Sequence, residues 1–447
     1  MKPINRYSPI TLHVLTSISA AALLMPIVMP LTAHSQQSKA STQATKPPIA
    51  QAWIDVATHA SDIPGMGAMA GFASGGIGGG LSGLFGGAKS GGNVFGNTRM
   101  SMAPGKWLDI SVTTRNEPNL AEAFDNIPTS MNMMPALKLT VPPPEKYDPP
   151  VKRDDEPVEP TYEKPKGRLL LYWGCGDTIR PGQPRVFDAA NPNLNDMQKF
   201  FGNMRNSTTR GARSAPGNPS WPNKTDDRKV PENASLAGEH QFVGQGIPDS
   251  FRVKLGDAQD FMAPYMISQK NVAGVIRLEW ASVANTRGYF ISAIGAKPGA
   301  NKDETEMVIW TSSDVPELGF ALGDYQTNAA IDKWIKEKAV LPASTTQCAV
   351  PKGIFGDGDS DSNRGGGGGM LRATAYGNEA FFAFPPRPTD VRVTWEPQWQ
   401  TKVRLKSTFM SLLGGMGDES GKTSGQQAPK KEEKITPVDL LKGLFGR

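Results

Sequence analysis

The 447-residue sequence has few of the side chains that enzymes use most often in catalysis or metal binding. It contains four histidines, and only His59 and His240 lie beyond the first 35 residues. Zinc sites and hydrolytic triads built on histidine need further ligands or a nucleophile in a recognisable pattern. The G-x-S-x-G, H-E-x-x-H, Walker A and dinucleotide-binding motifs are all absent. We therefore expect both histidines to be structural, and we predict no organic cofactor.

Charge is also scarce. Charged residues make up 20% of the chain, and the formal net charge is +5 at pH 7. A charge this small and dispersed is not typical of a nucleic-acid-binding surface, so we predict no nucleic-acid partner. Glycine and proline are abundant instead, with 48 and 38 residues. The chain is long enough for two or three domains with a real core, but much of it is predicted to be loop or linker.

The N-terminus carries the longest apolar run, from Ile10 to Leu31, after the basic residues Lys2 and Arg6. Together with the small residues around Ser35, this pattern is typical of a secretory signal peptide over residues 1–35. The alternative is an uncleaved anchor, because the run approaches the ~20 residues that span a bilayer. We predict cleavage after Ser35 and a location in the periplasm or at the cell surface.

Only two cysteines occur, Cys175 and Cys348. Because exported proteins fold in an oxidising compartment, we predict a disulfide between them. The alternative is two separate buried thiols. No histidine pattern accompanies either residue, which argues against a catalytic cysteine.

Residues 36–104 are predicted to be low in complexity, and the stretch 65–92 is nearly half glycine and almost without charge. Seven glycines recur four residues apart from Gly67 to Gly91, as in closely packed membrane helices. The alternative is a flexible loop, because interior glycines destabilise a helix. The last residues, 436–447, could form a small amphipathic helix. Membrane contact is therefore expected, if anywhere, through 65–92 or 436–447.

The region Val275–Ser313 predicts the fold class. Apolar residues alternate with polar ones in three successive runs that are separated by turn residues, which is typical of an antiparallel meander. Trp280 and Tyr289 are in phase with the apolar positions, so we expect both in one core. Further strands are predicted at 53–58, 107–113, 136–141, 168–173, 251–255, 391–395 and 403–407, a hairpin turn at Gly377-Asn378, and helices at 119–125, 194–204 and 331–338.

The link between Trp280 and Tyr289, read ASVANTRG, resembles the B–C connection of a fibronectin type III domain. Residues 370–388 resemble the last hairpin of that fold, which implies a β-sandwich that acts as a spacer or a binding module. The whole chain is similar to secreted proteins of Gram-negative bacteria, which implies no particular activity. We predict a mainly β protein with a few short helices and long disordered segments. The first expected domain is β-rich, at 105–246, and is interrupted by a proline-rich linker at 142–167. A fibronectin type III-like β-sandwich at 247–388 with an insertion at 314–369 is expected next. We then expect a strand pair at 389–410, with Lys402, Arg404 and Lys406 facing outward, and a tail at 411–447.

One acidic run has the spacing of a calcium loop, since oxygen donors occur at every second position. The glycine and the bidentate glutamate of such a loop are missing, so a solvated acidic loop is the alternative. The four predicted calcium ligands are Asp357, Asp359, Asp361 and Asn363.

These observations favour an exported, non-catalytic envelope protein that acts as a structural or adhesive binding module for an envelope protein or a glycan. One alternative is a carbohydrate-active hydrolase with a carboxylate pair, for which Asp177, Glu239, Asp260 and Glu279 are candidates. Another is a membrane-associated oligomer formed through the glycine-rich segment.

Overall fold

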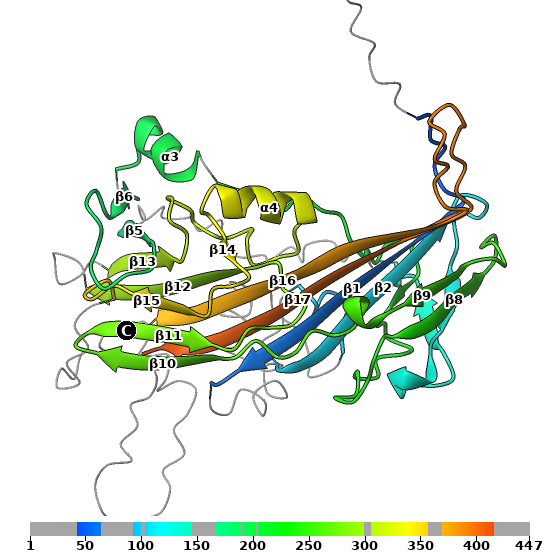
Figure 1. Ribbon diagram of the computed structural model, residues 1–447, viewed down its shortest axis with the longest axis horizontal. Helices are drawn as coiled ribbons and strands as arrows, with labels where there is room; N and C mark the ends of the chain where they lie inside the picture. Colours follow the sequence, from blue (N-terminus) through cyan, green and yellow to red (C-terminus); the bar gives the residue numbers. More distant parts are fainter. Residues whose placement is uncertain are drawn as a thin grey trace, which may run out of the picture.

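The computed structural model describes residues 43–63, 93–99, 103–144, 167–189, 191–202, 204–298, 305–355 and 369–414. As predicted, this part of the chain is mainly β, with two short α-helices (Figure 1). The strands form one large mixed sheet and one small antiparallel sheet.

The large sheet contains fourteen strands, in the order β6-β5-β13-β12-β16-β17-β1-β2-β7-β4-β3-β8-β9, with β14 paired to β12. Two pairs, β1 with β17 and β5 with β13, are parallel, and the other pairs in this sheet are antiparallel. The strands are β1 (Ala50–Ser61), β2 (Gly105–Thr114), β3 (Glu122–Asn126), β4 (Leu137–Thr140), β5 (Arg168–Trp173), β6 (Arg185–Asp188), β7 (Ser220–Trp221), β8 (Gly238–Gly244), β9 (Arg252–Leu255), β12 (Gly288–Pro298), β13 (Thr305–Thr311), β14 (Leu341–Pro342), β16 (Gly369–Phe384) and β17 (Trp399–Leu413).

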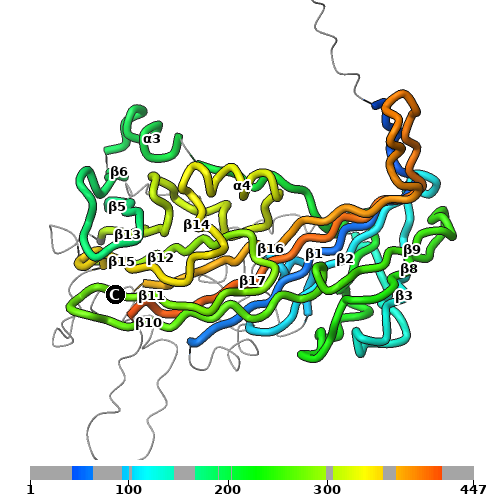
Figure 2. Tube along the Cα trace, in the orientation of Figure 1, coloured from blue at the N-terminus to red at the C-terminus, as the bar shows by residue number. Residues whose placement is uncertain are grey.

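The centre of this sheet joins the two ends of the described chain. Strand β1 lies between β2 and the C-terminal strand β17, and it pairs with β17 over its whole length, from Ala50–Trp399 to Ser61–Met410. The tube view shows the long strands β16, β17, β1 and β2 side by side (Figure 2). Because β1 and β17 are parallel, the segments that follow them in the sequence both leave from the same end of the sheet.

The small sheet consists of β10 (Ile267–Val272), β11 (Val275–Trp280) and β15 (Gln347–Val350). The meander prediction was therefore wrong in one respect, because β11 pairs with β10 and β15 and not with β12. Strands β12 and β13 do form the expected antiparallel pair. The predicted disulfide is present between Cys175 and Cys348, with a Cα–Cα distance of 5.2 Å, and it ties the small sheet to the segment that follows β5.

The main core lies on the face of the large sheet that packs against the small sheet. Trp280 and Tyr289 are both buried in it, with ring centroids 5.6 Å apart, and the Tyr289 hydroxyl accepts a hydrogen bond from the Val283 backbone. The same cluster takes side chains from Ala50 to Leu413. It thus crosses the domain boundaries expected at residues 246 and 388.

The opposite face of the sheet is covered by loops and by the two helices. Helix α4 (Asn328–Lys336) packs with Phe290 and Tyr376 in a second apolar cluster. Helix α3 (Leu194–Phe201) packs against β6 through Phe187 and Phe200. Its N-cap is Asn193, as predicted, whose side chain accepts a hydrogen bond from the Asp196 backbone.

Three local predictions were wrong. Residues 122–126 form β3 instead of a helical turn, since they pair with both β4 and β8. The chain does not turn at Gly377-Asn378. Strand β16 continues through this point with an irregularity, and its long pairing with β17 follows a turn beyond Phe384. Residues 391–395 do not pair with 403–407, because β16 and β1 already occupy both sides of β17. Two 3-10 turns, η1 (Thr129–Met131) and η2 (Asp257–Gln259), complete the described structure.

Candidate functional site

A row of charged residues crosses the loop-covered face of the central strands. In register, Asp109 of β2 lies opposite Asp55 of β1, Asp55 lies opposite Arg404 of β17, and Arg404 lies opposite Glu379 of β16. Because side chains alternate between the faces of a strand, these positions all face away from the main core. We call these four residues the charged row.

The centre of the charged row is a buried ion pair. The Arg404 guanidinium donates to both carboxylate oxygens of Asp55, at 2.6 Å from Nε to Oδ1, and both side chains are 2% exposed. Asp55 also accepts a hydrogen bond from the Ala212 backbone. The prediction that Lys402, Arg404 and Lys406 face outward was wrong, because loops cover this face of the sheet. Glu379 pairs with Lys402 at 3.0 Å, and both of these side chains are largely buried.

Burial shifts the pKa values of three groups beside this ion pair. Burial raises the pKa of Asp109 to about 7, although hydrogen bonds from the Thr98 hydroxyl and the Gly96 backbone oppose the rise. Burial, helped by the nearby charge of Lys406, lowers the pKa of His59 to about 3. Burial also lowers the pKa of Lys406 to about 8, and the carboxylate of Asp324 opposes that change.

Groups with shifted pKa values often mark functional sites, but structural ion-pair networks shift them as well. Here the polar atoms are engaged inside the protein. His59 contacts the Thr408 hydroxyl at 2.5 Å and the Asn97 carbonyl at 2.9 Å, and Lys406 donates to the carbonyls of Arg99 and Gly323. The arrangement therefore serves to hold the loops onto the sheet. The sequence signal that could have revealed it is the placement of Asp55 and Asp109 inside strands that are otherwise apolar.

His240 is the second histidine of the predicted pair, and it is fully buried. Its Nδ1 lies 2.9 Å from a carboxylate oxygen of Asp125, and its Nε2 lies 3.0 Å from the Leu236 carbonyl. Burial opposes protonation of this ring, but the charge of Asp125 and the hydrogen bonds to Asp125 and the Leu236 carbonyl together raise the His240 pKa. Glu239 points away and pairs with Arg252, so the two neighbours do not form a joint site.

Three of the four carboxylates considered for hydrolysis have ion-pair or hydrogen-bond partners of their own. Asp177 pairs with Arg277, whereas Glu239 pairs with Arg252 on β9. Asp260 accepts hydrogen bonds from the Ser235 hydroxyl and the Leu236 backbone, and Glu279 is exposed on β11. The four predicted calcium ligands, Asp357, Asp359, Asp361 and Asn363, lie outside the described residues. Within the residues described, no cluster of three or more histidine, cysteine or acidic side chains is suited to a metal ion.

A projection stands away from the body of the protein at the end of β16 and β17, where residues 43–49 and 384–398 lie together (Figures 1 and 2). We call it the finger. Gln43 organises it, because its side chain donates to the Val393 carbonyl at 2.9 Å and accepts from Arg387 at 2.6 Å. Backbone hydrogen bonds join Trp395 to residues 44 and 46, and the Arg387 guanidinium lies over the Trp395 ring.

The finger presents apolar side chains to solvent. Val391 is 52% exposed and Val393 is 50% exposed, and Phe384 and Phe381 are exposed at its base. Its two ion pairs, Lys46–Glu396 and Arg392–Asp390, leave Arg387 as an additional cation. An ordered projection with exposed apolar residues is a typical protein-binding surface.

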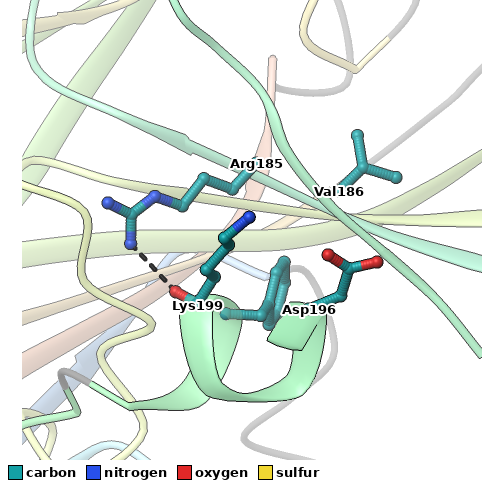
Figure 3. Close-up of a pocket in the computed structure, with 5 residues that line it drawn as sticks. Arg185, Val186, Asp196 and Lys199 are labelled. Carbon is teal, nitrogen blue, oxygen red and sulfur yellow. Dashed lines mark hydrogen bonds between the residues drawn. The ribbon is translucent and has the colours of Figure 1, made fainter. Parts of the chain in front are cut away.

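A shallow pocket of about 310 Å³ lies between β6 and α3 (Figure 3). It is lined by Arg185 and Val186 from the strand and by Asp196, Lys199 and Phe200 from the helix. In Figure 3 the amino group of Lys199 lies between Arg185 and Asp196. Volumes of ~300 Å³ are at the lower end of the range for small-molecule sites.

Comparisons with known proteins give no match: no family model, no curated protein and no solved structure is similar to this chain. The fibronectin type III resemblance thus remains a prediction. No helix among the described residues is both long enough and apolar enough to cross a membrane.

Proposed function

We propose that the protein is an exported, non-catalytic binding module of the cell envelope and that it binds a partner protein through the finger. The observation that carries this proposal is the finger itself. Its internal hydrogen bonds hold the segment that carries Val391 and Val393, both of which are exposed. Preformed apolar projections lose little conformational entropy on binding, so a small surface can bind with useful affinity.

The test is a comparison of two sets of aspartate substitutions in the mature protein. Val391→Asp with Val393→Asp should abolish capture of the envelope partner after cross-linking in the native host. Val243→Asp is the matched control, because Val243 is 43% exposed on β8, in another part of the large sheet. If the Val391→Asp, Val393→Asp variant captures the partner as well as the Val243→Asp variant does, the finger is not the binding surface. Thermal unfolding of each variant establishes that the fold is intact.

A second candidate function, membrane association, is favoured by where the strands end. The segments 65–92 and 436–447, which have the sequence features of membrane contact, follow β1 and β17 in the chain. These strands are parallel neighbours that end together, at Ser61 opposite Met410. The described chain therefore leaves both strands at the end of the sheet opposite the finger, at Ile63 and Gly414. This would let one end of the protein contact a membrane while the other meets a partner.

Flotation of the protein with vesicles of phosphatidylethanolamine and phosphatidylglycerol tests this second candidate. The full-length mature chain should float, and a variant in which 65–92 is replaced by a Gly/Ser linker of equal length and 436–447 is removed should stay at the bottom. If the two proteins behave alike, membrane association through these segments is wrong, and the finger proposal is unaffected.

A further inference from the structure

The pocket between β6 and α3 contains two cations that form no ion pair with any carboxylate of the described residues. Arg185 donates to the Lys199 carbonyl at 3.1 Å, and its guanidinium lies over the Trp173 ring. Lys199 is exposed, and its amino group makes no hydrogen bond within the described part of the chain. By contrast, the largely buried cations Arg404 and Lys402 are paired with acids.

The one acid in the pocket is already engaged. Asp196 contacts the side-chain amide of Asn193, whose oxygen in turn accepts from the Asp196 backbone. This exchange caps α3 and fixes the carboxylate toward the start of the helix. The pocket therefore keeps a net positive charge, with two cations and one acid.

The rest of the lining is apolar. Val186 is 43% exposed, and Phe200 is a buried residue of the lining. Contacts between the rings of Phe187, Phe200 and Phe201 hold α3 against β6, so the pocket does not depend on a flexible loop. Exposed apolar side chains also continue along the helix at Leu194 and Met197.

We propose that this pocket binds a small amphiphilic anion. The carboxylate or phosphate head would lie between Arg185 and Lys199, and a short alkyl or aryl chain would lie against Val186 and Phe200. Charge-assisted hydrogen bonds from guanidinium and ammonium groups recognise such heads, and the planar guanidinium of Arg185 is already oriented by Trp173 and the Lys199 carbonyl. This site is separate from the finger, so it extends the proposed function without depending on it.

Calorimetric titration of the mature protein at low salt with four probes tests both halves of the site. Octanoate should bind, and acetate and octanol should bind at least about tenfold more weakly, since each lacks either the chain or the charge. Octyl phosphate distinguishes the two possible heads: binding as tight as that of octanoate would mean that the pocket accepts phosphate as well as carboxylate. If acetate or octanol binds as tightly as octanoate, or if octanoate does not bind, the proposal is wrong.

Substitutions then locate the site. Arg185→Ala and Lys199→Ala should each weaken octanoate binding about tenfold or more, because each removes one charged contact. Lys333→Ala is the matched control: Lys333 is 70% exposed on α4, away from this pocket, and its loss should leave the affinity unchanged. Equal weakening by the control would indicate non-specific charge attraction and would overturn the assignment. Raising the salt concentration should weaken binding to the wild type and have less effect on the Arg185→Ala variant.

Discussion

Asp109 provides the sharpest test of the electrostatics in this fold, because it is a buried acid whose pKa lies far from its ordinary value. Its carboxyl accepts hydrogen bonds from Thr98 and Gly96, and its neighbour in the charged row is Asp55. Asparagine has the same shape and carries no charge. Its carbonyl oxygen can accept from Gly96 and its amide can donate to the Thr98 hydroxyl. The substitution Asp109→Asn therefore removes the titration, keeps the hydrogen bond from Gly96 and reverses the direction of the one with the Thr98 hydroxyl.

The expected effect depends on pH. The folded state raises the pKa of Asp109 from 3.8 to about 7, so the folded state holds the proton more tightly than the unfolded state does. The stability that this provides is fully present below pH 3.8 and is lost as the pH rises through about 7. A shift of this size corresponds to about 4 kcal/mol of unfolding free energy at most. The Asn variant has no such loss, so its stability relative to the wild type should rise by about 4 kcal/mol from pH 3.5 to pH 8.

Urea unfolding at several pH values from 3.5 to 8 measures this difference. His59 has the opposite pH dependence, because its lowered pKa makes the folded state lose stability as the pH falls from 6.5 toward about 3. Comparing the variant with the wild type at each pH removes that contribution. Asp249→Asn is the control, since Asp249 is exposed and lies outside the charged row. A difference between Asp109→Asn and the wild type that stays constant within about 1 kcal/mol would refute the reasoning.

Three further predictions follow from packing and pairing. Replacing Cys175 and Cys348 by serine should lower the unfolding free energy by up to about 5 kcal/mol on the chain-entropy model, because the bridge spans 173 residues. Thermal unfolding of the wild type with and without a reducing agent gives an independent measurement. Trp280→Ala should cost on the order of 3–5 kcal/mol, as seen by urea unfolding, and an unchanged midpoint would contradict its role in the core. Arg404→Ala should lower the unfolding free energy by about 3–5 kcal/mol, because Asp55 remains buried and unpaired. The double variant Asp55→Leu, Arg404→Met should recover most of that stability. If it does not, packing and not the charge dominates the effect.

Much of the strand content could be predicted from the sequence. The apolar run at 168–173 predicted strand β5, and the helical spacing of apolar residues after Asn193 predicted helix α3. The structure has both elements. The pairing of the two cysteines was predicted from their number and from the predicted export of the chain. These are cases in which a local pattern or simple counting leaves few alternatives.

The partners of the strands could not be predicted in the same way. Alternation in Val275–Trp280 shows that one face is buried, but it does not show whether the neighbouring strand is β12 or β15. The parallel pairing of β1 with β17 joins segments about 350 residues apart, and nothing local indicates it. The charged row was missed for the same reason, since Asp55 and Arg404 become neighbours only when these strands meet.

The charged row has a consequence for how this sheet selects one register. Along the core face of β1 the residues are small or aliphatic at every second position, from Ala50 to Val56. A slip of one residue against β17 would turn these side chains away from the core, so the apolar pattern opposes it. A slip of two residues keeps every side chain on its own face, and the similar residues along this strand would penalise it only weakly. That slip would move Asp55 about 7 Å along the strand from Arg404. Asp55 would then lie opposite Lys402 or Lys406, and Arg404 would lie opposite Ala57 or Trp53, so the two-oxygen contact between the guanidinium and the Asp55 carboxylate would be lost. Apolar alternation thus opposes odd slips, and loss of the bidentate Asp55–Arg404 contact opposes even ones. We therefore infer that the charged row contributes to the pairing of two strands that the sequence places so far apart.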